Sequence, residues 1–287
     1  MFEPATRGAL RVRGRTLPWG ARTYVMGIVN VSPDSFSGDG DPDARAAVAS
    51  ALAHLTHGAD VVDVGAESTR PGHRPIDAAT ERARLLPALA AIRAAAPDAI
   101  VSVDTFKPDV FRDAVVAGGD IMNSIWGASD DAIRACAETG APIVVMHNKA
   151  VALYEHDVVD EVLWSLESAA ARCVRGGIPA EHVLVDPGIG FGKLPEHNLA
   201  VLRSLGRIVG LGFPTLIGTS RKSTIGKLTG RAVDAREFGT AATIALAVAA
   251  GIDVVRVHDV PEQRDVVRVA DAIVRGWRPE EWAERLP

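Results

Sequence analysis

The chain has little of what marks a disulfide-linked, thiolate-bound or membrane-spanning protein. Among its 287 residues only Cys136 and Cys173 are cysteines. Both fall in segments with helical spacing, which argues against a disulfide framework or a thiolate metal site. No apolar run approaches the roughly 20 residues that a membrane helix needs, and residues 1–10 lack the pattern of a secretion signal. We therefore expect a cytoplasmic protein with no membrane partner.

Lysine is also scarce. Only five of the 31 basic residues are lysines, namely Lys107, Lys149, Lys193, Lys222 and Lys227. Four of them follow strand-like segments, where a compact ammonium can act as a point charge and a planar guanidinium cannot. The net charge is −5, and no basic stripe interleaved with aromatic residues appears. A nucleic-acid partner is therefore not expected.

Short apolar, β-branched segments alternate with helical patterns along the chain. Strands are expected at residues 24–29, 61–64, 100–103, 121–122, 143–146, 183–185, 214–217 and 254–257, with helices between them that include 197–209. Such strands are typical of buried parallel sheets. Eight strand-helix units predict an α/β fold, a closed (β/α)8 TIM barrel rather than an open doubly wound sheet. Residues 10–17 alternate like a β-hairpin, so residues 1–22 should cap a single domain of residues 23–287.

Polar or ionisable residues follow every predicted strand. In a TIM barrel the chemistry lies at the carboxyl ends of the strands. One site should therefore gather Asn30, Asp63, Asp104, Asn123, His147, Asp186, Lys222 and Arg256 or His258. Buried carboxylates need strong donors, so Asp104 and Asp186, with the amide of Asn123, suit a heterocycle that presents several N–H groups on one edge.

Three loops and the last strand carry further candidates. In residues 186–193, alternating glycines would let the backbone approach a flat ligand, and Phe191 offers an apolar face. Residues 67–72 (ESTRPG) and 220–223 (SRKS) place cations and hydroxyls where they could hold an anion. The alternative reading of both segments is a solvated turn or a helix cap. Arg256 and His258 share one face of the last strand; His258 is otherwise a packed histidine.

Together these motifs resemble dihydropteroate synthase, a folate-pathway family. The resemblance covers residues 26–260 and rests on motifs in the family's order, at residues 27–37 (GIVNVSPDSFS), 63–72, 102–105, 123, 186–193, 220–223 and 256–259. It implies a TIM barrel that condenses 6-hydroxymethyl-7,8-dihydropterin diphosphate with p-aminobenzoate. The implied products are 7,8-dihydropteroate and pyrophosphate, and the implied assembly is a homodimer.

The resemblance also implies roles for individual residues. The pterin would be bound by Asp104, Asn123, Asp186 and Lys222. Asn30 would ligate Mg2+ on the diphosphate, and the p-aminobenzoate site would comprise Asp34, Phe36, Arg70, Phe191 and Ser223. The residues implied in catalysis are Asn30, Thr69, Arg70, Lys222, Arg256 and His258.

Two positions depart from the family pattern, and two other functions stay open. Ser124 stands where the family usually has Asp, which would remove a carboxylate from the edge of the pocket, and Asp39 is shifted by one place. One alternative is a pterin-binding paralogue without catalysis. The other is a pterin-dependent corrinoid methyltransferase, although the SRKS turn and the loop bearing Phe36 fit the synthase better.

Overall fold

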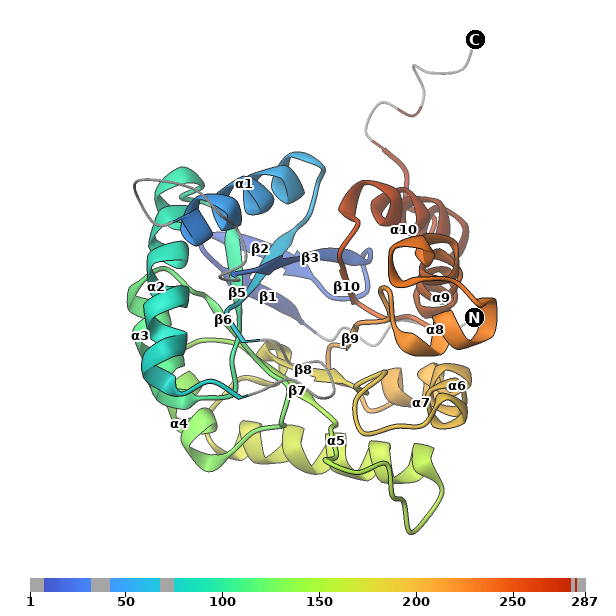
Figure 1. Cartoon of the computed structure of the whole chain (residues 1–287). Helices are drawn as coiled ribbons and strands as arrows, with labels where there is room; N and C mark the ends of the chain where they lie inside the picture. Colours follow the sequence, from blue (N-terminus) through green and yellow to red (C-terminus); the bar gives the residue numbers. More distant parts are fainter. Residues whose placement is uncertain (1–7, 32–41, 68–74, 280–281, 283–287) are drawn as a thin grey trace.

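The computed structural model describes residues 8–31, 42–67, 75–279 and 282, and within them the chain forms a barrel of parallel strands surrounded by helices (Figure 1). The strands follow the order β8-β7-β6-β5-β4-β3-β10-β9. They are β3 (Tyr24–Asn30), β4 (Val61–Gly65), β5 (Ile100–Asp104), β6 (Ile121–Ser124), β7 (Ile143–Met146), β8 (Val183–Asp186), β9 (Leu216–Ile217) and β10 (Val254–Val257). The predicted TIM barrel is confirmed.

Helices lie between successive strands and cover the outside of the barrel (Figure 1). They are α1 (Pro42–Thr56), α2 (Ala78–Ala95), α3 (Pro108–Val116), α4 (Asp130–Thr139), α5 (Val158–Arg175), α6 (Pro195–Arg203), α7 (Leu205–Val209), α8 (Ser223–Thr229), α9 (Glu237–Ala249) and α10 (Val260–Val274). Short 3-10 turns occupy Ala180–His182 and Val233–Ala235. In the part of the chain that the structure describes, no helix combines the length and apolar character needed to cross a membrane.

Two predicted elements differ from those observed. The helix expected at residues 197–209 is two helices, because Ser204 leaves the helical conformation between α6 and α7. The strand expected at residues 214–217 is reduced to Leu216–Ile217. Pro214 has no N–H to donate to a ladder, and both the N–H and the hydroxyl of Thr215 donate to Asp253 Oδ2, at 2.8 and 2.9 Å.

The barrel consequently closes through very little backbone pairing. Between β8 and the segment containing β9 there is one isolated bridge, from Val185 to Thr215. The N–H of Val185 donates to the carbonyl of Pro214 at 2.9 Å. Each of the other neighbouring strand pairs in the sheet forms a ladder with two or more paired positions.

The alternation of residues along each strand separates two cores. One set of buried residues, including Val25, Val62 and Val101, belongs to the cluster that also contains the apolar faces of the helices. The other set fills the amino-terminal end of the barrel and comprises Met26, Val61, Ile100, Ile121, Val144, Leu184, Leu216 and Val254. Because this layer is entirely apolar, the described polar residues of the lumen lie further toward the carboxyl end.

The N-terminal hairpin closes the apolar end. Its strands, β1 (Ala9–Val12) and β2 (Arg15–Pro18), pair antiparallel as predicted. Leu10, Leu17 and Trp19 pack into the same cluster as the first lumen layer and are at most 6% exposed. The Trp19 indole also donates to the carbonyl of Glu181 at 2.9 Å. The hairpin therefore acts as a lid over the lower end of the lumen.

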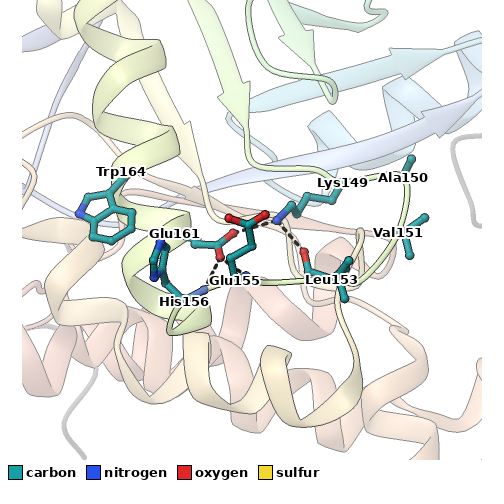
Figure 2. A pocket seen from close by; sticks show the side chains of 8 residues that line it. All are labelled: Lys149, Ala150, Val151, Leu153, Glu155, His156, Glu161 and Trp164. Atoms are coloured by element: carbon teal, nitrogen blue, oxygen red, sulfur yellow. Dashed lines mark hydrogen bonds and ion pairs between the residues drawn. The ribbon is translucent and has the colours of Figure 1, made fainter.

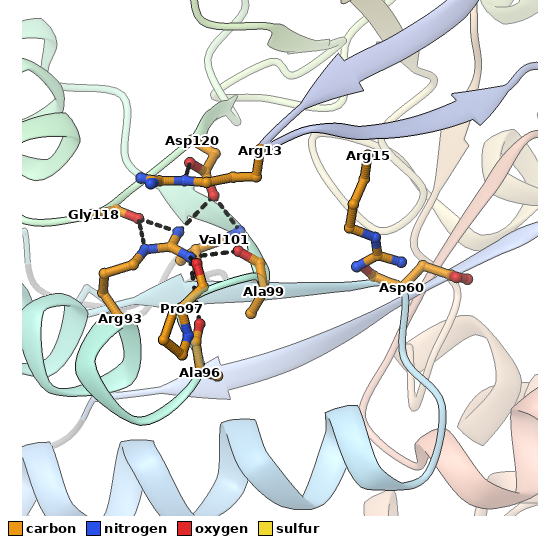
Figure 3. Close-up of polar contacts among 10 residues, drawn as sticks. All are labelled: Arg13, Arg15, Asp60, Arg93, Ala96, Pro97, Ala99, Val101, Gly118 and Asp120. Carbon is orange, nitrogen blue, oxygen red and sulfur yellow. Dashed lines mark hydrogen bonds and ion pairs between the residues drawn. The ribbon is translucent and has the colours of Figure 1, made fainter.

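Asp120 links this hairpin to the barrel (Figure 3). Its carboxylate accepts from Arg13 at 2.6 Å and from Arg93 at 2.7 Å, and from the N–H of Val101 at 2.9 Å. Arg93 also donates to the carbonyl of Gly118 at 2.6 Å. One buried carboxylate thus joins the hairpin, the end of α2 and the start of β5.

Asp120→Ala should lower the free energy of unfolding by roughly 2–4 kcal/mol, because it leaves a partly buried guanidinium and a backbone N–H without their acceptor. Urea denaturation measures the loss. The matched control is Asp109→Ala on α3, whose side chain is 81% exposed and pairs with Arg112 on the same helix. That change should cost less than about 0.5 kcal/mol; equal losses in the two variants would contradict the assignment.

Candidate functional site

A cavity of about 260 Å3 lies at the carboxyl end of the barrel. Its polar lining combines cationic, anionic and amide side chains from different strand ends: Asn30, Glu67, Asp104, Ser220, Arg221, Lys222, Ser223, Arg236, Arg256 and His258. Ile28 and Phe191 supply apolar surface. Of the predicted site residues, seven therefore line one cavity: Asn30, Asp104, Phe191, Lys222, Ser223, Arg256 and His258.

A second, larger hollow lies outside this site, between α5 and the loop that precedes it (Figure 2). Its volume is about 740 Å3, and Val151, Leu153 and Trp164 supply apolar lining. Two of its charged residues pair with each other, since Lys149 donates to Glu161 at 2.8 Å. It lacks the converging strand-end residues of the barrel cavity, so we assign the chemistry to the latter.

Arg256 joins two carboxylates at the base of the cavity. Its Nε donates to Asp63 Oδ2 at 2.6 Å, and its Nη2 donates to Asp104 Oδ2 at 2.8 Å. Asn123 Nδ2 donates to the same oxygen of Asp63 at 3.1 Å. The Asp63 side chain is fully buried. Asp63, which the sequence placed in the site without a role, therefore holds Arg256 and Asn123 in place.

The two carboxylate oxygens of Asp104 differ in their contacts. Its Oδ1 is buried and has no hydrogen-bond partner among the residues that the structure describes. Burial raises the pKa of Asp104 to about 7; Arg256 opposes this shift, whereas Asp63 and Glu81 add to it. A buried acceptor without a partner is rare. Because Asp104 lines the cavity, its carboxyl group is suited to accept a hydrogen bond from a ligand.

Asp186 and Asn123 are buried and are not among the residues that line the cavity. They are 5% and 4% exposed. Asp186 Oδ1 accepts from the N–H of Gly188 at 2.7 Å. Burial raises the pKa of Asp186 to about 6, opposed first by that N–H and then by Lys222 and Lys193. Asp186 thus combines a backbone contact with a position close to Lys222.

Lys222 and Phe191 form one side of the cavity. The ammonium of Lys222 lies 3.9 Å from the centroid of the Phe191 ring, within the range of a cation–π contact. A Cβ on Gly190 would lie 2.9 Å from Lys222 Cδ. Glycine at position 190 therefore leaves room for the lysine stem.

The other two glycines of this loop, Gly188 and Gly192, pack closely within the protein. A Cβ on Gly188 would lie 2.0 Å from the carbonyl oxygen of His147, and one on Gly192 would lie 2.3 Å from that of Lys149. Both glycines also have positive φ. Gly188 and Gly192 thus allow a close approach to the backbone that follows β7, and the expectation that they approach a flat ligand stays a prediction.

Ser220 and Arg221 interact within the protein. Ser220 Oγ accepts from the N–H of His258 at 3.2 Å and lies 2.9 Å from His258 Nδ1. Arg221, in a left-handed conformation with φ of 58°, forms an ion pair with Asp259. Ser220 thus positions the His258 ring, while Ser223 is exposed at the first residue of α8.

Sequence reasoning missed an ion-pair cluster beside the cavity. Lys107 Nζ lies 2.5 Å from Glu67 Oε2 and 2.5 Å from Glu81 Oε2, and the Glu81 side chain is fully buried. Glu67 lines the cavity, and its other oxygen accepts from the N–H of Ile76 at 3.3 Å. The scarcity of lysine was the signal available, because Lys107 lies three residues beyond the end of β5.

Some predicted positions lie outside the described residues, and one lies on the wrong face. Asp34, Phe36, Asp39, Thr69 and Arg70 belong to the first group and stay predictions. Ser124 follows Asn123 in β6, so its side chain points away from the lumen. The expectation that Ser124 removes a carboxylate from the edge of the pocket is therefore wrong.

Comparison with known proteins gives a consistent result. A family model described as "Pterin binding enzyme" matches residues 26–258. Dihydropteroate synthase from Clostridium beijerinckii is 38% identical over 270 residues, which cover 93% of this chain and all of that protein.

Solved structures agree over nearly the whole chain. Dihydropteroate synthase from Xanthomonas albilineans, solved with 4-aminobenzoic acid, is 39% identical with a TM-score of 0.87, and the match covers 97% of this chain and 99% of that one. The enzyme from Thermus thermophilus in complex with 6HMPPP is 40% identical with a TM-score of 0.82, covering 93% and 100%.

Asp104 should make the stability of the protein depend on pH. Its pKa is about 7 in the folded protein and about 4 in an unfolded chain. Between these values the folded protein holds a proton that the unfolded chain has lost, so this contribution to the free energy of unfolding declines as pH rises from about 4 to about 7.

Asp104→Asn should remove that decline. Urea denaturation across this pH range should give a less negative slope of unfolding free energy against pH than in the wild type. The control is Ser102→Ala, which changes the same face of β5 without removing a charge and should keep the wild-type slope. Identical slopes for Asp104→Asn and the wild type would show that Asp104 does not take up this proton.

Proposed function

The chain belongs to the pterin-binding enzyme family as a dihydropteroate synthase, and from this we propose how the barrel cavity joins 6-hydroxymethyl-7,8-dihydropterin diphosphate to p-aminobenzoate. One observation carries the assignment of the site. The unpartnered oxygen of the buried Asp104 lies in the same cavity as Lys222, Arg256, His258 and Asn30. An acceptor for a heterocycle is thus combined with cations for a diphosphate.

The pterin ring presents several N–H groups and a ring acceptor. We propose that Asp104, Asn123 and Asp186 bind the N–H groups, and that Lys222 donates to the acceptor. The raised pKa values of Asp104 and Asp186 fit this role, because a carboxylate destabilised by burial gains most when a donor arrives. Arg256, held by Asp63 and Asp104, stays charged beside the pterin.

The diphosphate needs donors and a cation. His258 and Arg256 lie at the cavity, and Thr69 and Arg70 complete the proposed set. The residues present also fit Mg2+: Asn30 offers an amide oxygen, a hard ligand that lines the cavity. Mg2+ in phosphate sites commonly takes one or two protein ligands, the rest being phosphate oxygens and water. The absence of a three-residue ligand cluster among the described residues is compatible with that mode of binding.

The reaction breaks the bond between the pterin methylene carbon and the diphosphate oxygen, and forms a bond from that carbon to the aminobenzoate nitrogen, which then loses a proton. Arg256 and His258 stabilise the charge that develops on the departing diphosphate. Mg2+ supplies further stabilisation of the same charge when bound. Because the electron-rich pterin supports positive charge on the methylene carbon, no strong base is required.

The second substrate is proposed to lie between Phe191 and Ser223. The ring of Phe191 offers an apolar face to the aromatic ring of p-aminobenzoate, and the hydroxyl of Ser223 can donate to its carboxylate. Both side chains line the cavity beside Lys222. Asp34, Phe36 and Arg70 are the remaining residues of this proposed subsite.

We further propose a homodimer in the cytoplasm. On α9 and α10, Phe238, Leu246, Val269 and Ile273 are 62–85% exposed, and within α9 only Glu237 is charged. A large exposed apolar surface marks an interaction site, and a second copy of the chain is the proposed partner. The buried, free thiols of Cys136 and Cys173 suit a reducing compartment.

The test of the function is direct. Purified protein incubated with dihydropterin diphosphate, Mg2+ and p-aminobenzoate should release 7,8-dihydropteroate and pyrophosphate, detected by chromatography and a coupled pyrophosphate assay. Tight binding of the pterin without product would instead favour a pterin-binding paralogue. Methyl transfer to a corrinoid in place of condensation would favour the methyltransferase.

Lys222→Arg should reduce kcat/KM on the order of 100-fold, because a planar fork cannot replace a point charge between Gly190 and the Phe191 ring. Steady-state kinetics with both substrates measures the loss. The matched control is Lys227→Arg on α8, an exposed lysine in the same helix region that should keep the wild-type rate. A wild-type rate in Lys222→Arg would refute the role given to the ammonium.

A further inference from the structure

Lys193 lies next to the site and has no part in the function described above. Its half-buried side chain folds back toward the end of β7. The ammonium nitrogen lies 2.8 Å from His147 Nδ1, 3.0 Å from the carbonyl oxygen of Gly188 and 3.2 Å from that of Phe191. It therefore contacts both the residue that follows β7 and the loop that carries Phe191.

These contacts match the chemistry of a protonated lysine. An ammonium has three N–H donors, and the three shortest contacts are to three acceptors. A neutral amine has two donors and would direct its lone pair at one of those acceptors. His147 is suited to accept at Nδ1, because burial and the charges of Lys193 and Lys149 lower its pKa to about 3 and keep the ring neutral.

The same loop is held closely on its other side. The hydroxyl of Tyr154 donates to the carbonyl of Gly192 at 2.8 Å, and the Tyr154 ring stacks on His147 with 6.1 Å between centroids. Gly188 and Gly192 permit the close backbone approach described above. Phe191 lies between these anchored glycines, and its ring contacts the ammonium of Lys222.

We propose that Lys193 is a positioning residue: its ammonium fixes residues 188–192 against the end of β7 and so holds Phe191 where p-aminobenzoate binds. This inference rests on the proposed function for its substrate. The contacts that hold the loop do not depend on that function, so the two can be tested separately.

Holding the loop in this way should depend on pH. Burial, together with the charges of Lys222 and Lys149, lowers the pKa of Lys193 to about 7, and Asp186 opposes the shift. His147, the remaining titratable group in contact with the ammonium, is neutral near that pH. As pH rises through about 7, Lys193 loses one donor and the loop is held less firmly.

The experiment compares wild type with Lys193→Met, which keeps the length of the side chain and removes its charge. At pH 6.5 the variant should raise KM for p-aminobenzoate on the order of tenfold, more than it changes kcat or KM for the pterin substrate. In the wild type this KM should rise between pH 7 and 9, and in the variant it should be high throughout.

Two further variants separate positioning from general damage. Lys149→Met removes a neighbouring lysine that pairs with Glu161 and contacts the Tyr154 ring; it should keep the wild-type KM at pH 6.5. His147→Phe keeps a ring beside Tyr154 but removes the Nδ1 acceptor, and should raise KM for p-aminobenzoate less than Lys193→Met does.

Hydrogen exchange followed by mass spectrometry tests the loop without substrate. In Lys193→Met, the amides of residues 188–192 should exchange faster than in wild type, while those of the hairpin at residues 9–18 stay unchanged. If the wild-type protein makes no dihydropteroate, the proposed function fails and this comparison alone decides the role of Lys193. Unchanged exchange, or equal increases across the whole protein, overturns the proposal, as does an unchanged KM for p-aminobenzoate.

Discussion

The guanidinium of Arg256 is the interaction on which the carboxyl end of the barrel depends. It crosses from β10 to carboxylates on β4 and β5, and Asp63 and Asp104 are nearly inaccessible to water. Two buried carboxylates on neighbouring strands would repel each other, and one would be forced to bind a proton. With the cation between them, Asp63 accepts from both Arg256 and Asn123, while Asp104 keeps an oxygen for a ligand.

This arrangement is possible because the amino-terminal end of the barrel is built differently. Its lumen layer is apolar and is covered by the hairpin, so that packing alone stabilises it. The charged residues lie beyond this apolar layer and do not have to stabilise the fold. Buried ion pairs contribute little to stability. The chain therefore separates a stabilising end from an end in which carboxylate pKa values are raised by burial.

The sequence predicted most of this because the decisive signals are local. Short β-branched runs such as residues 143–146 and 254–257 determine the strands, and the polar residue that follows each run falls at the barrel mouth. Interactions between distant segments could not be predicted from the sequence. The fit of Gly188 against His147 and the pairing of Lys107 with Glu67 and Glu81 depend on which segments meet in three dimensions.

The barrel closes weakly between β8 and β9, and we call this junction the seam of the barrel. The loop bearing Phe191 leaves β8 on one side of this seam, and Lys222 follows β9 on the other. Their cation–π contact therefore spans the seam. Because only one backbone bridge joins the two edges, the width of the cavity at this point is set by side chains. Substitutions of those side chains can thus adjust the fit for the second substrate without rebuilding a strand ladder.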